Sequence, residues 1–216
     1  MNYSAVIFDM DGVIFDSERA VLECWLELAK ERGIENIEEQ YYKCVGTNTS
    51  KNKEIFIEAY GEEFAFEEVY KASSVLFHSK YDGGKLPMKP GVFELLDFLK
   101  VEGKTIALAS STRKETVTKE LQWAGLLDYF DLLVCGDMIK NSKPAPDIFL
   151  QACEKLGITT DEAYVIEDSY NGIRAAHNAG IRSIMVPDML KPDAEMEEKA
   201  EMILPSLLDV IEYLMQ

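Results

Sequence analysis

Near its start the sequence reads Ala5-Val6-Ile7-Phe8-Asp9-Met10-Asp11-Gly12-Val13, and this stretch decides the expected fold. Its four consecutive apolar residues predict a strand that is buried on both faces, as in sheets covered by helices. The strand ends in two aspartates that are separated by one residue and followed by a glycine. Because side chains two positions apart point the same way in extended backbone, Asp9 and Asp11 are expected to face one site.

A carboxylate pair at the end of a buried strand suits a hard cation such as Mg2+, and one carboxylate suits the role of a nucleophile. An Asp-x-Asp pair alone is also common by chance on protein surfaces. A calcium-binding loop that starts at Asp9 is a further alternative, but it needs glycine at its sixth position and glutamate at its twelfth. Those positions hold Ile14 and Ala20, which excludes the calcium loop.

The composition is that of an ordinary soluble globular protein, with 47% hydrophobic and 28% charged residues among 216. This length suffices for one sizeable core with an insert, or for two small domains. The net charge of -17, without a basic cluster, argues against nucleic acid or an anionic membrane as a partner. If the substrate is a phosphate ester, a local cation and a lysine must attract it against this global charge.

The cysteines show neither Cys-x-x-Cys spacing nor the density of a disulfide framework, and they are predicted to be buried and reduced. They are Cys24, Cys44, Cys135 and Cys153. Reduced thiols predict a cytoplasmic protein, and we see no signal peptide and no apolar run long enough to span a bilayer. The two histidines, His78 and His177, are too few for a histidine-rich zinc site and are predicted to be surface or helix residues.

The pattern along the chain predicts an α/β protein with an insertion. Between Ser17 and Tyr81 the apolar spacing is helical, with Asp16 and Ser17 predicted to cap the first helix. After Pro90, helices alternate with apolar strands, which are predicted at residues 105–110, 132–135, 163–166, 183–186 and 202–204. Such alternation implies a Rossmann-like parallel sheet with helices on both faces. We therefore predict an α/β core of residues 1–16 and 86–216, interrupted by an all-helical cap of residues 17–85.

Polar residues follow the later strands, at the sheet edge where function collects in open α/β folds. One segment is Ser110-Ser111-Thr112, which could bind phosphate oxygens or could instead cap the helix that starts near Lys114. A second is Lys143 with prolines nearby, which is either a phosphate-binding cation or part of a plain loop. The third is Glu167-Asp168, an acidic pair that is costly at the end of a buried strand unless it binds something. Mg2+ held by Asp168, with Glu167 contacting it directly or through water, is the predicted reason.

Taken together and in order, these four motifs resemble the haloacid dehalogenase superfamily of aspartyl-phosphate enzymes, over essentially the whole chain. The stretches 107–110 and 142–149 especially resemble β-phosphoglucomutase and its phosphatase relatives, and the insert resembles their small helical cap. The resemblance implies that Asp9 attacks phosphorus and that Asp11 protonates the leaving oxygen and then activates water. It further implies Mg2+ held by the Asp9 side chain, the Asp11 backbone carbonyl and the acidic pair Glu167 and Asp168. Ser110 and Lys143 would stabilise the phosphoryl oxygens.

An aspartate at position 11 argues against two other branches of that superfamily. The halide-removing members use no metal, and the transport ATPases carry threonine at that position because their intermediate must persist. The cap would close over the site, exclude water and read the leaving group, with hinges near residues 15–17 and 83–84. The predicted substrate-binding residues are Ser17, Trp25, Gly46, Thr47 and Asn48 in the cap, with Ser111 and Thr112 in the core.

The cap departs from the mutase pattern in two places. β-Phosphoglucomutases carry a histidine where this chain has Val21, and an arginine just after the cap-loop glycine, where this chain has Thr47-Asn48-Thr49. A mutase must hold a bisphosphate intermediate, so these departures favour simple hydrolysis. Lys51 or Lys53 could replace the arginine, which keeps the mutase as an alternative.

The sequence therefore predicts a monomeric, cytoplasmic, Mg2+-dependent phosphatase that hydrolyses a small phosphorylated metabolite, a sugar phosphate or similar. It leaves sugar phosphates, nucleotides and phosphoglycolate open as substrates. A more remote alternative is a non-enzymatic phospho-acceptor like the bacterial receiver domains, which also use aspartate, Mg2+, a hydroxyl residue and lysine. Receivers are far shorter, have no cap and carry their phosphorylated aspartate on a later strand.

Overall fold

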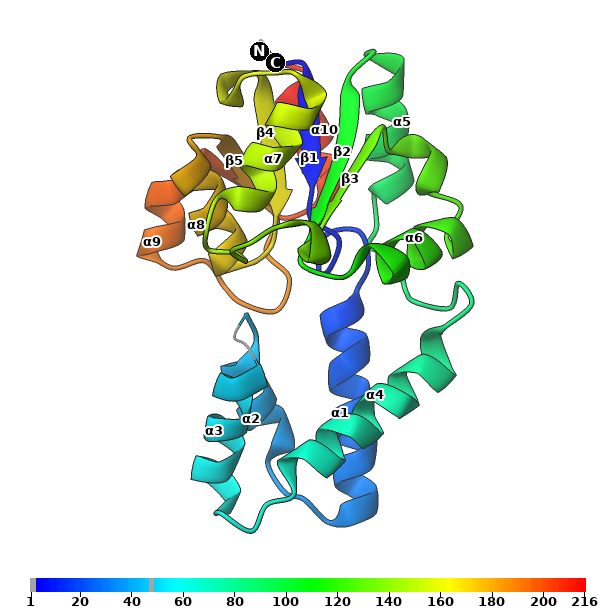
Figure 1. The fold of residues 1–216 in the computed structure, drawn as a ribbon, viewed down its shortest axis with the longest axis vertical. Coiled ribbons are helices and arrows are strands. Elements are labelled where there is room, and N and C mark those ends of the chain that lie inside the picture. Colours follow the sequence, from blue (N-terminus) through cyan, green and yellow to red (C-terminus); the bar gives the residue numbers. More distant parts are fainter. Residues whose placement is uncertain (1–2, 47–48) are drawn as a thin grey trace. The chain divides into compact units, whose positions relative to one another are not determined.

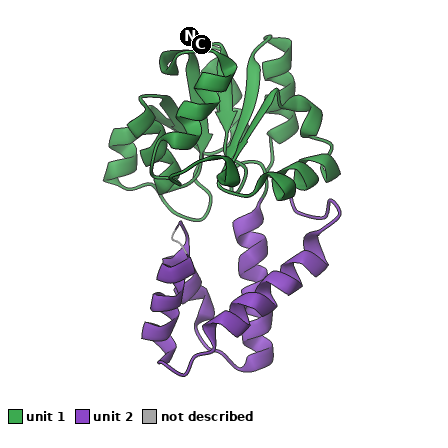
Figure 2. Cartoon of the chain, in the orientation of Figure 1, with its two compact units in different colours: residues 1–15, 88–216 green, residues 16–87 purple. Residues whose placement is uncertain are grey.

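A computed structural model describes residues 3–46 and 49–216 of the chain and divides it into two compact units (Figure 2). The first unit comprises residues 1–15 and 88–216, and the second comprises residues 16–87. These boundaries lie one and two residues from the ends predicted for the cap. Thr47 and Asn48, both predicted to bind substrate, lie outside the described residues.

The first unit is built on a six-stranded sheet in which every neighbouring pair is parallel (Figure 1). The strands are β1 (Ala5–Phe8), β2 (Thr105–Ser110), β3 (Leu132–Cys135), β4 (Ala163–Glu167), β5 (Arg182–Met185) and β6 (Met202–Ile203). Their order across the sheet is β3-β2-β1-β4-β5-β6. The prediction of a parallel α/β sheet is confirmed, and every predicted strand is present within one residue at each end.

Strand β1 occupies the middle of this sheet because its sequence is apolar on both faces. Phe8 lies level with Leu108 of β2 and Ile166 of β4, so the three strands end at one edge. The chain builds outward from β1 through β2 and β3 on one side, and through β4, β5 and β6 on the other. This reversal is the topological switch point at which α/β folds place their ligands.

Helices cover both faces of the sheet. They are α5 (Val92–Val101), α6 (Lys114–Trp123), α7 (Asp147–Leu156), α8 (Tyr170–Ala179), α9 (Ala194–Lys199) and α10 (Leu207–Leu214). Helix α7 contacts β2 and β3, and α8 contacts α7, β4 and β5, whereas α5 contacts β2 and α10. Short 3-10 turns lie at Leu127–Tyr129, Gly136–Met138 and Thr160–Glu162.

The core beneath α7 and α8 combines small strand residues with larger helix residues. Ala107 and Ala109 of β2 leave room for Ile148 and Phe149 of α7, and all four side chains are completely buried. Full burial of a side chain the size of Ile148 or Phe149 stabilises the fold by about 1.5–3 kcal/mol. This packing fixes the strand ends on which the site is built.

The second unit consists of helices α1 (Ser17–Arg32), α2 (Ile37–Cys44), α3 (Thr49–Tyr60) and α4 (Phe66–Tyr81), without a strand among its described residues. Its core is aromatic, since the ring of Trp25 lies 4.9 Å from that of Phe56 and 6.2 Å from that of Phe66, measured between centroids. Asp16 stands at the predicted capping position of α1, but its side chain makes no capping hydrogen bond. Its carboxylate pairs with Arg19 of the same helix at 3.3 Å.

The cysteines and histidines lie in the environments that the composition predicts. All four cysteines are buried and free of disulfides, and burial raises the pKa of Cys44, Cys135 and Cys153 to about 11. Both histidines are exposed residues on helices, as predicted. Within residues 3–46 and 49–216, no helix combines the length and apolarity that crossing a bilayer requires.

Candidate active site

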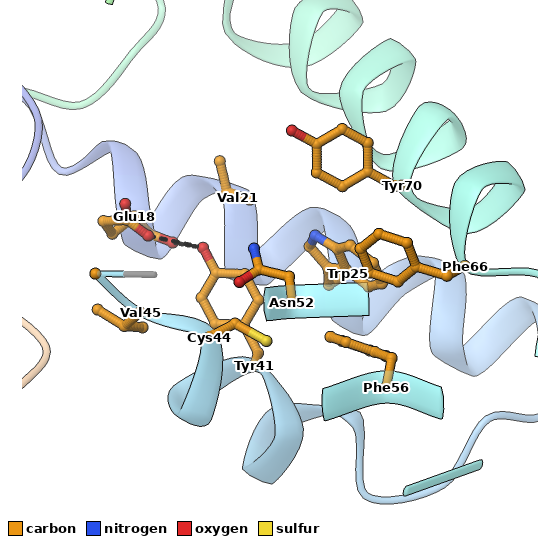
Figure 3. A pocket seen from close by; sticks show the side chains of 11 residues that line it. Glu18, Val21, Trp25, Tyr41, Cys44, Val45, Asn52, Phe56, Phe66 and Tyr70 are labelled. Carbon is orange, nitrogen blue, oxygen red and sulfur yellow. Dashed lines mark hydrogen bonds between the residues drawn. The ribbon is translucent and has the colours of Figure 1, made fainter. Parts of the chain in front are cut away.

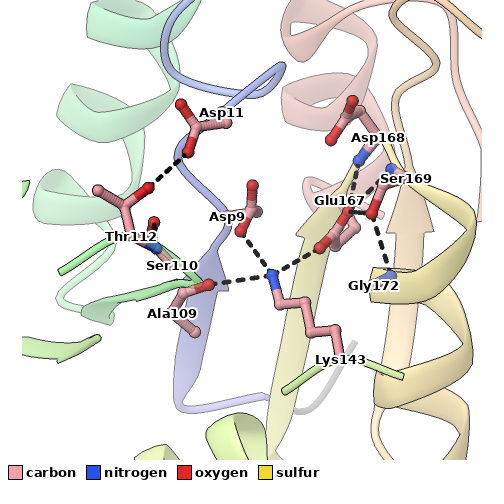
Figure 4. A network of polar contacts seen from close by, with 10 residues as sticks. All are labelled: Asp9, Asp11, Ala109, Ser110, Thr112, Lys143, Glu167, Asp168, Ser169 and Gly172. Carbon is pink, nitrogen blue, oxygen red and sulfur yellow. Dashed lines mark hydrogen bonds and ion pairs between the residues drawn. The ribbon is translucent and has the colours of Figure 1, made fainter. Parts of the chain in front are cut away.

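The predicted motifs meet at the carboxyl edge of the sheet in the first unit (Figure 4). Asp9 and Asp11 follow β1, Ser110 ends β2, and Glu167 ends β4. Lys143 comes from the loop before α7 and reaches the same place, 134 residues from Asp9 in the sequence. The parallel sheet therefore brings together residues from four separate segments.

Asp9 is a buried carboxylate held by its neighbours, with 7% of the residue exposed. Its backbone N–H donates to the carbonyl of Ile166 at 3.0 Å, which extends the pairing of β1 and β4 by one residue. Its Oδ1 accepts a hydrogen bond from Lys143 Nζ at 2.5 Å. The backbone and side-chain contacts together fix this carboxylate at the end of the central strand.

Lys143 bridges three acceptors in the site. Its Nζ donates to Asp9 Oδ1 at 2.5 Å, to Glu167 Oε1 at 2.7 Å and to the backbone carbonyl of Ala109 at 3.1 Å. An ammonium has three donors, so this arrangement uses all of them. The side chain is only 7% exposed, and a charge this buried is stable only when it is paired.

The charges of the site influence one another strongly because water is largely excluded. Burial raises the pKa of Asp9 to about 8, and Glu167 and Asp11 add to this effect while Lys143 opposes it. Burial alone would lower the pKa of Lys143, but the carboxylates of Asp9 and Glu167 more than offset this and raise it. Lys143 therefore remains charged. The ionised form of Asp9, which a nucleophile requires, depends on positive charge nearby.

Glu167 is completely buried, and both of its oxygens are hydrogen-bonded. Oε1 accepts from Lys143, and Oε2 accepts from the backbone N–H groups of Asp168 and Ser169 and from the Ser169 hydroxyl, at 2.8–2.9 Å. Gly172, in the first turn of α8, leaves the space that this carboxylate occupies. A Cβ at Gly172 would lie 1.7 Å from Glu167 Oε1.

Asp168 completes an acidic cluster that fits a hard cation. Asp9, Glu167 and Asp168 can each supply one oxygen, and these atoms all lie within 4.8 Å of one another. Mg2+ prefers carboxylate oxygens and water, so the donor set suits it. Gly12 has φ of 78°, and a Cβ there would lie 2.3 Å from Asp168 Oδ2, so only glycine allows this close approach.

Asp11 lies outside this acidic cluster and has a different partner. Its Oδ2 accepts a hydrogen bond from the Thr112 hydroxyl at 3.1 Å. The side chain of Asp11 is partly exposed, whereas Asp9 is buried. The two aspartates thus lie in different environments. The proposed contact of the Asp11 backbone carbonyl with a metal stays a prediction.

Ser110 is completely buried, and its Oγ accepts a hydrogen bond from the Thr112 backbone N–H at 3.1 Å. The alternative in which 110–112 cap the next helix is wrong. Arg113 occupies the capping position of α6, and the Lys114 N–H donates to Asp137. Residues 110–112 therefore do not cap α6; Thr112 lies beside Asp11, and Ser111 is exposed.

Comparison with known proteins identifies the family. A model of the haloacid dehalogenase-like hydrolase family matches residues 6–186. The chain belongs to the haloacid dehalogenase-like hydrolases. Within this family it is 34% identical to the phosphorylated carbohydrates phosphatase of Thermotoga maritima, with 83% of each chain covered. It is 30% identical to the fructose-1-phosphate phosphatase YqaB of Escherichia coli, with 85% of this chain and 96% of that one covered.

Solved structures of haloacid dehalogenase-like proteins share the fold. A candidate beta-phosphoglucomutase from Thermotoga maritima has a TM-score of 0.81 at 31% identity, with 98% of each chain covered. CbbY from Rhodobacter sphaeroides, solved in complex with phosphate, has a TM-score of 0.73 at 25% identity over 97% of this chain and 96% of that one. The predicted family and the predicted class of enzyme, a phosphatase of this superfamily, are confirmed.

Sequence reasoning missed several groups that shape this haloacid dehalogenase-like site. Ser169 both hydrogen-bonds Glu167 and caps α8, since its Oγ accepts from the Gly172 N–H at 3.0 Å. The Ser-x-x-Gly spacing after the acidic pair was a usable capping signal. The contact of Lys143 with the Ala109 carbonyl had no sequence signal, because any residue can supply a backbone carbonyl. The bond from Thr112 to Asp11 had none either, since the two lie 101 residues apart.

The substrate residues predicted in the helical unit have mixed placements. Ser17 is buried at the start of α1, and Trp25 is buried in the aromatic core, with 4% exposed. Gly46 has φ of 74°, and together with Trp25 it lines a pocket inside this unit (Figure 3).

Proposed function

We propose that this chain is a Mg2+-dependent phosphatase that hydrolyses a small phosphorylated metabolite through an aspartyl phosphate on Asp9. The observation that carries the proposal is the buried Asp9 carboxylate, held by Lys143 and flanked by the acidic pair Glu167 and Asp168. The phosphatase relatives of the same family support this function.

In the proposed first step, Asp9 Oδ2 attacks phosphorus while Oδ1 keeps its hydrogen bond from Lys143. The bond between phosphorus and the ester oxygen breaks, and protonated Asp11 gives its proton to that oxygen. The leaving group departs as an alcohol, and the phosphoryl group stays on Asp9. In the second step Asp11 accepts a proton from water, whose oxygen attacks phosphorus. The bond between Asp9 and phosphorus breaks, which regenerates the Asp9 carboxylate and releases phosphate.

The remaining groups of the site would stabilise charge on the transferred phosphoryl group. Lys143 places its positive charge beside Asp9, and the Ser110 hydroxyl is a further donor for a phosphoryl oxygen. Mg2+, held by the side chains of Asp9 and Asp168 with Glu167 adjacent, would neutralise phosphoryl charge and support the ionised form of Asp9. Positive charge at this site attracts a phosphate ester, which the net charge of -17 otherwise repels.

Hydrolysis is preferred to the mutase reaction because the positions expected to hold a second phosphate carry another residue or have a carboxylate beside them. Val21 stands where the mutases carry histidine. Lys51 pairs with Glu54 at 2.9 Å and Lys53 pairs with Glu67, so each candidate for the missing arginine has a carboxylate beside it. A carboxylate next to each lysine reduces its attraction for phosphate.

Phosphate release from a panel of sugar phosphates and nucleotides, with Mg2+ or with EDTA, tests the proposal. We expect release that requires both Mg2+ and Asp9, so that Asp9→Asn abolishes it. The exposed Asp128→Asn is the matched control and should retain full activity. Conversion of β-glucose 1-phosphate into glucose 6-phosphate without phosphate release would contradict hydrolysis and establish the mutase. Mg2+ binding without turnover of any ester would contradict both reactions.

A further inference from the structure

The segment that carries Lys143 is irregular, although the lysine itself is held by three hydrogen bonds. It runs from Ile139, after the 3-10 turn Gly136–Met138, to Pro146, before α7 begins at Asp147. We call residues 139–146 the lysine loop. A loop without helix or strand has no regular pairing to fix its backbone, so its individual hydrogen bonds decide how precisely it is held.

Several hydrogen bonds of the lysine loop join it to its own ends. The Ala145 N–H donates to the Ser142 carbonyl at 3.0 Å. Asn141 donates through its backbone N–H and through its side-chain amide to Asp147 Oδ1, at 3.2 and 2.9 Å. These bonds shape the loop, but they do not attach its backbone to another part of the core.

Asn178 supplies such an attachment. Its side-chain amide donates to the backbone carbonyl of Pro144, the residue after Lys143, at 3.0 Å. A carbonyl only accepts hydrogen bonds, so the nitrogen of the Asn178 amide faces it. Within the described part of the chain, Asn178 is the one side chain beyond α7 that hydrogen-bonds the backbone of the lysine loop.

The helix that carries Asn178 does not need this residue for its own stability. Asn178 is exposed in the last turn of α8, where asparagine is a weaker helix former than alanine. The end of α8 is closed by Gly180, whose N–H donates to the carbonyls of Ala176 and His177. The side chain of Asn178 therefore serves the lysine loop and not the helix.

Helix α8 thus contacts the surroundings of Lys143 at both of its ends. At its start, Ser169 donates from its N–H and its hydroxyl to Glu167 Oε2, while Glu167 Oε1 accepts from Lys143 (Figure 4). At its end, Asn178 holds the carbonyl of Pro144. One end fixes the partner of the ammonium group, and the other fixes the main chain from which the lysine side chain starts.

We propose that Asn178 is a positioning residue for Lys143 and that it influences the reaction through this lysine. The inference rests on the proposed phosphatase function. A charge stabilises the transferred phosphoryl group only if it is already in place, and a misplacement of about 1 Å costs up to about 100-fold in rate. Asn178 keeps the main chain of Lys143 at the position from which Nζ reaches Asp9.

Asn178→Ala removes the hydrogen bond without weakening α8, because alanine is the better helix former. With Mg2+ and the best ester of the substrate panel, we expect kcat to fall about three- to tenfold, with KM within about twofold of the parent and no fall in melting temperature. His177→Ala, the exposed neighbour on α8, is the matched control and should keep the parental kcat. A parental kcat in Asn178→Ala would overturn the inference.

The double variant Lys143→Met/Asn178→Ala tests whether Asn178 acts through the lysine. Two substitutions that remove the same interaction are not additive. Once Lys143 is replaced, Asn178→Ala should therefore change the remaining kcat less than about 1.5-fold. An equal fold loss in both backgrounds would show that Asn178 affects the site by another route, and would overturn the inference.

Amide hydrogen exchange, followed by mass spectrometry, separates this inference from the proposed function because it needs no turnover. We expect peptides that cover residues 139–147 to exchange at least about threefold faster in Asn178→Ala than in the parent, with unchanged exchange in β1 and β4. Unchanged exchange in residues 139–147 would overturn the inference, whatever the activity. Faster exchange there, in a chain that hydrolyses no ester, would support the contact of Asn178 and count against the phosphatase alone.

Discussion

Lys143 is the residue whose single charge links the two sides of the site. It contacts Asp9, Glu167 and a backbone carbonyl at once, and its side chain is 7% exposed. Replacing it removes the positive charge beside the proposed nucleophile and also leaves two buried carboxylates without their cation. We therefore expect two separate losses from one substitution.

Lys143→Met should reduce kcat for phosphate release at least about 100-fold, because a preorganised charge of this kind contributes on that scale. It should also lower the free energy of unfolding by about 3–5 kcal/mol, the usual cost of breaking a buried ion pair from one side. Phosphate release and urea unfolding measure the two effects, with the exposed Lys140→Met as control. Full activity in Lys143→Met would rule out its proposed role.

Thr112 was predicted to bind substrate, but its hydroxyl already donates a hydrogen bond within the site. The hydroxyl donates to Asp11, so we expect Thr112 to act as a positioning residue for the proposed acid and base. Thr112→Val should lower kcat/KM for benzyl phosphate about tenfold or more, and Thr112→Ser should restore most of it. The effect should be much smaller with 4-nitrophenyl phosphate, whose leaving oxygen hardly needs a proton. Equal losses with both esters would point to a purely structural role.

At the scale of single elements, helix α8 owes its close approach to the site to Gly172. Glycine in a helix normally costs about 1 kcal/mol relative to alanine, so Gly→Ala in a helix is usually stabilising. Here the added Cβ would meet the Glu167 carboxylate at 1.7 Å, which forces α8 or Glu167 to move. Gly172→Ala should therefore destabilise the fold by about 1–3 kcal/mol, the usual cost of overpacking, and should reduce activity.

Thermal unfolding measures the predicted loss of stability in Gly172→Ala, and phosphate release measures the predicted loss of activity. His177→Ala, an exposed substitution on the same helix, is the control and should change little. If Gly172→Ala raised the melting temperature and kept full activity, the close contact between α8 and Glu167 would be refuted.

The strands were predictable from sequence because apolar runs of four to six residues bounded by turn signals have few other interpretations. The bounds of β2 and β3 match the prediction, and those of β4 and β5 shift by a single residue. Asp16 takes the predicted capping position of α1, but its carboxylate pairs with the Arg19 guanidinium and makes no capping hydrogen bond. Contacts such as Lys143 to Ala109 lay beyond sequence reasoning, since they depend on backbone positions that only the folded sheet defines.

The whole molecule carries a charge of -17, and three of its carboxylates converge on one point at the edge of the sheet. Mg2+ held by Asp9 and Asp168, with Glu167 adjacent, would relieve this repulsion in the folded state and would find no such cluster in the unfolded chain. We therefore expect millimolar Mg2+ to raise the melting temperature by several degrees, and EDTA to reverse the effect. Calorimetry with and without Mg2+ measures this change directly.

Asp168→Asn should remove most of that stabilisation by Mg2+, whereas Asp128→Asn, which changes charge equally on the surface, should preserve it. A rise of equal size in both variants would mean that Mg2+ acts through general screening of the acidic surface. In that case the acidic cluster would not be the metal site.

The central position of β1 has a consequence for how the chain is made. The ribosome produces β1 long before β4, one of its two partners, because Ala163, where β4 begins, lies 155 positions after Phe8. At about 5–20 residues per second, the apolar run 5–8 waits for β4 for roughly 8 to 30 seconds. During that interval β1 can pair with β2 once residue 110 has been made, but its other edge has no partner strand. Nascent chains of this protein are therefore expected to be natural clients of ribosome-associated chaperones, and to aggregate when synthesis stalls before residue 163.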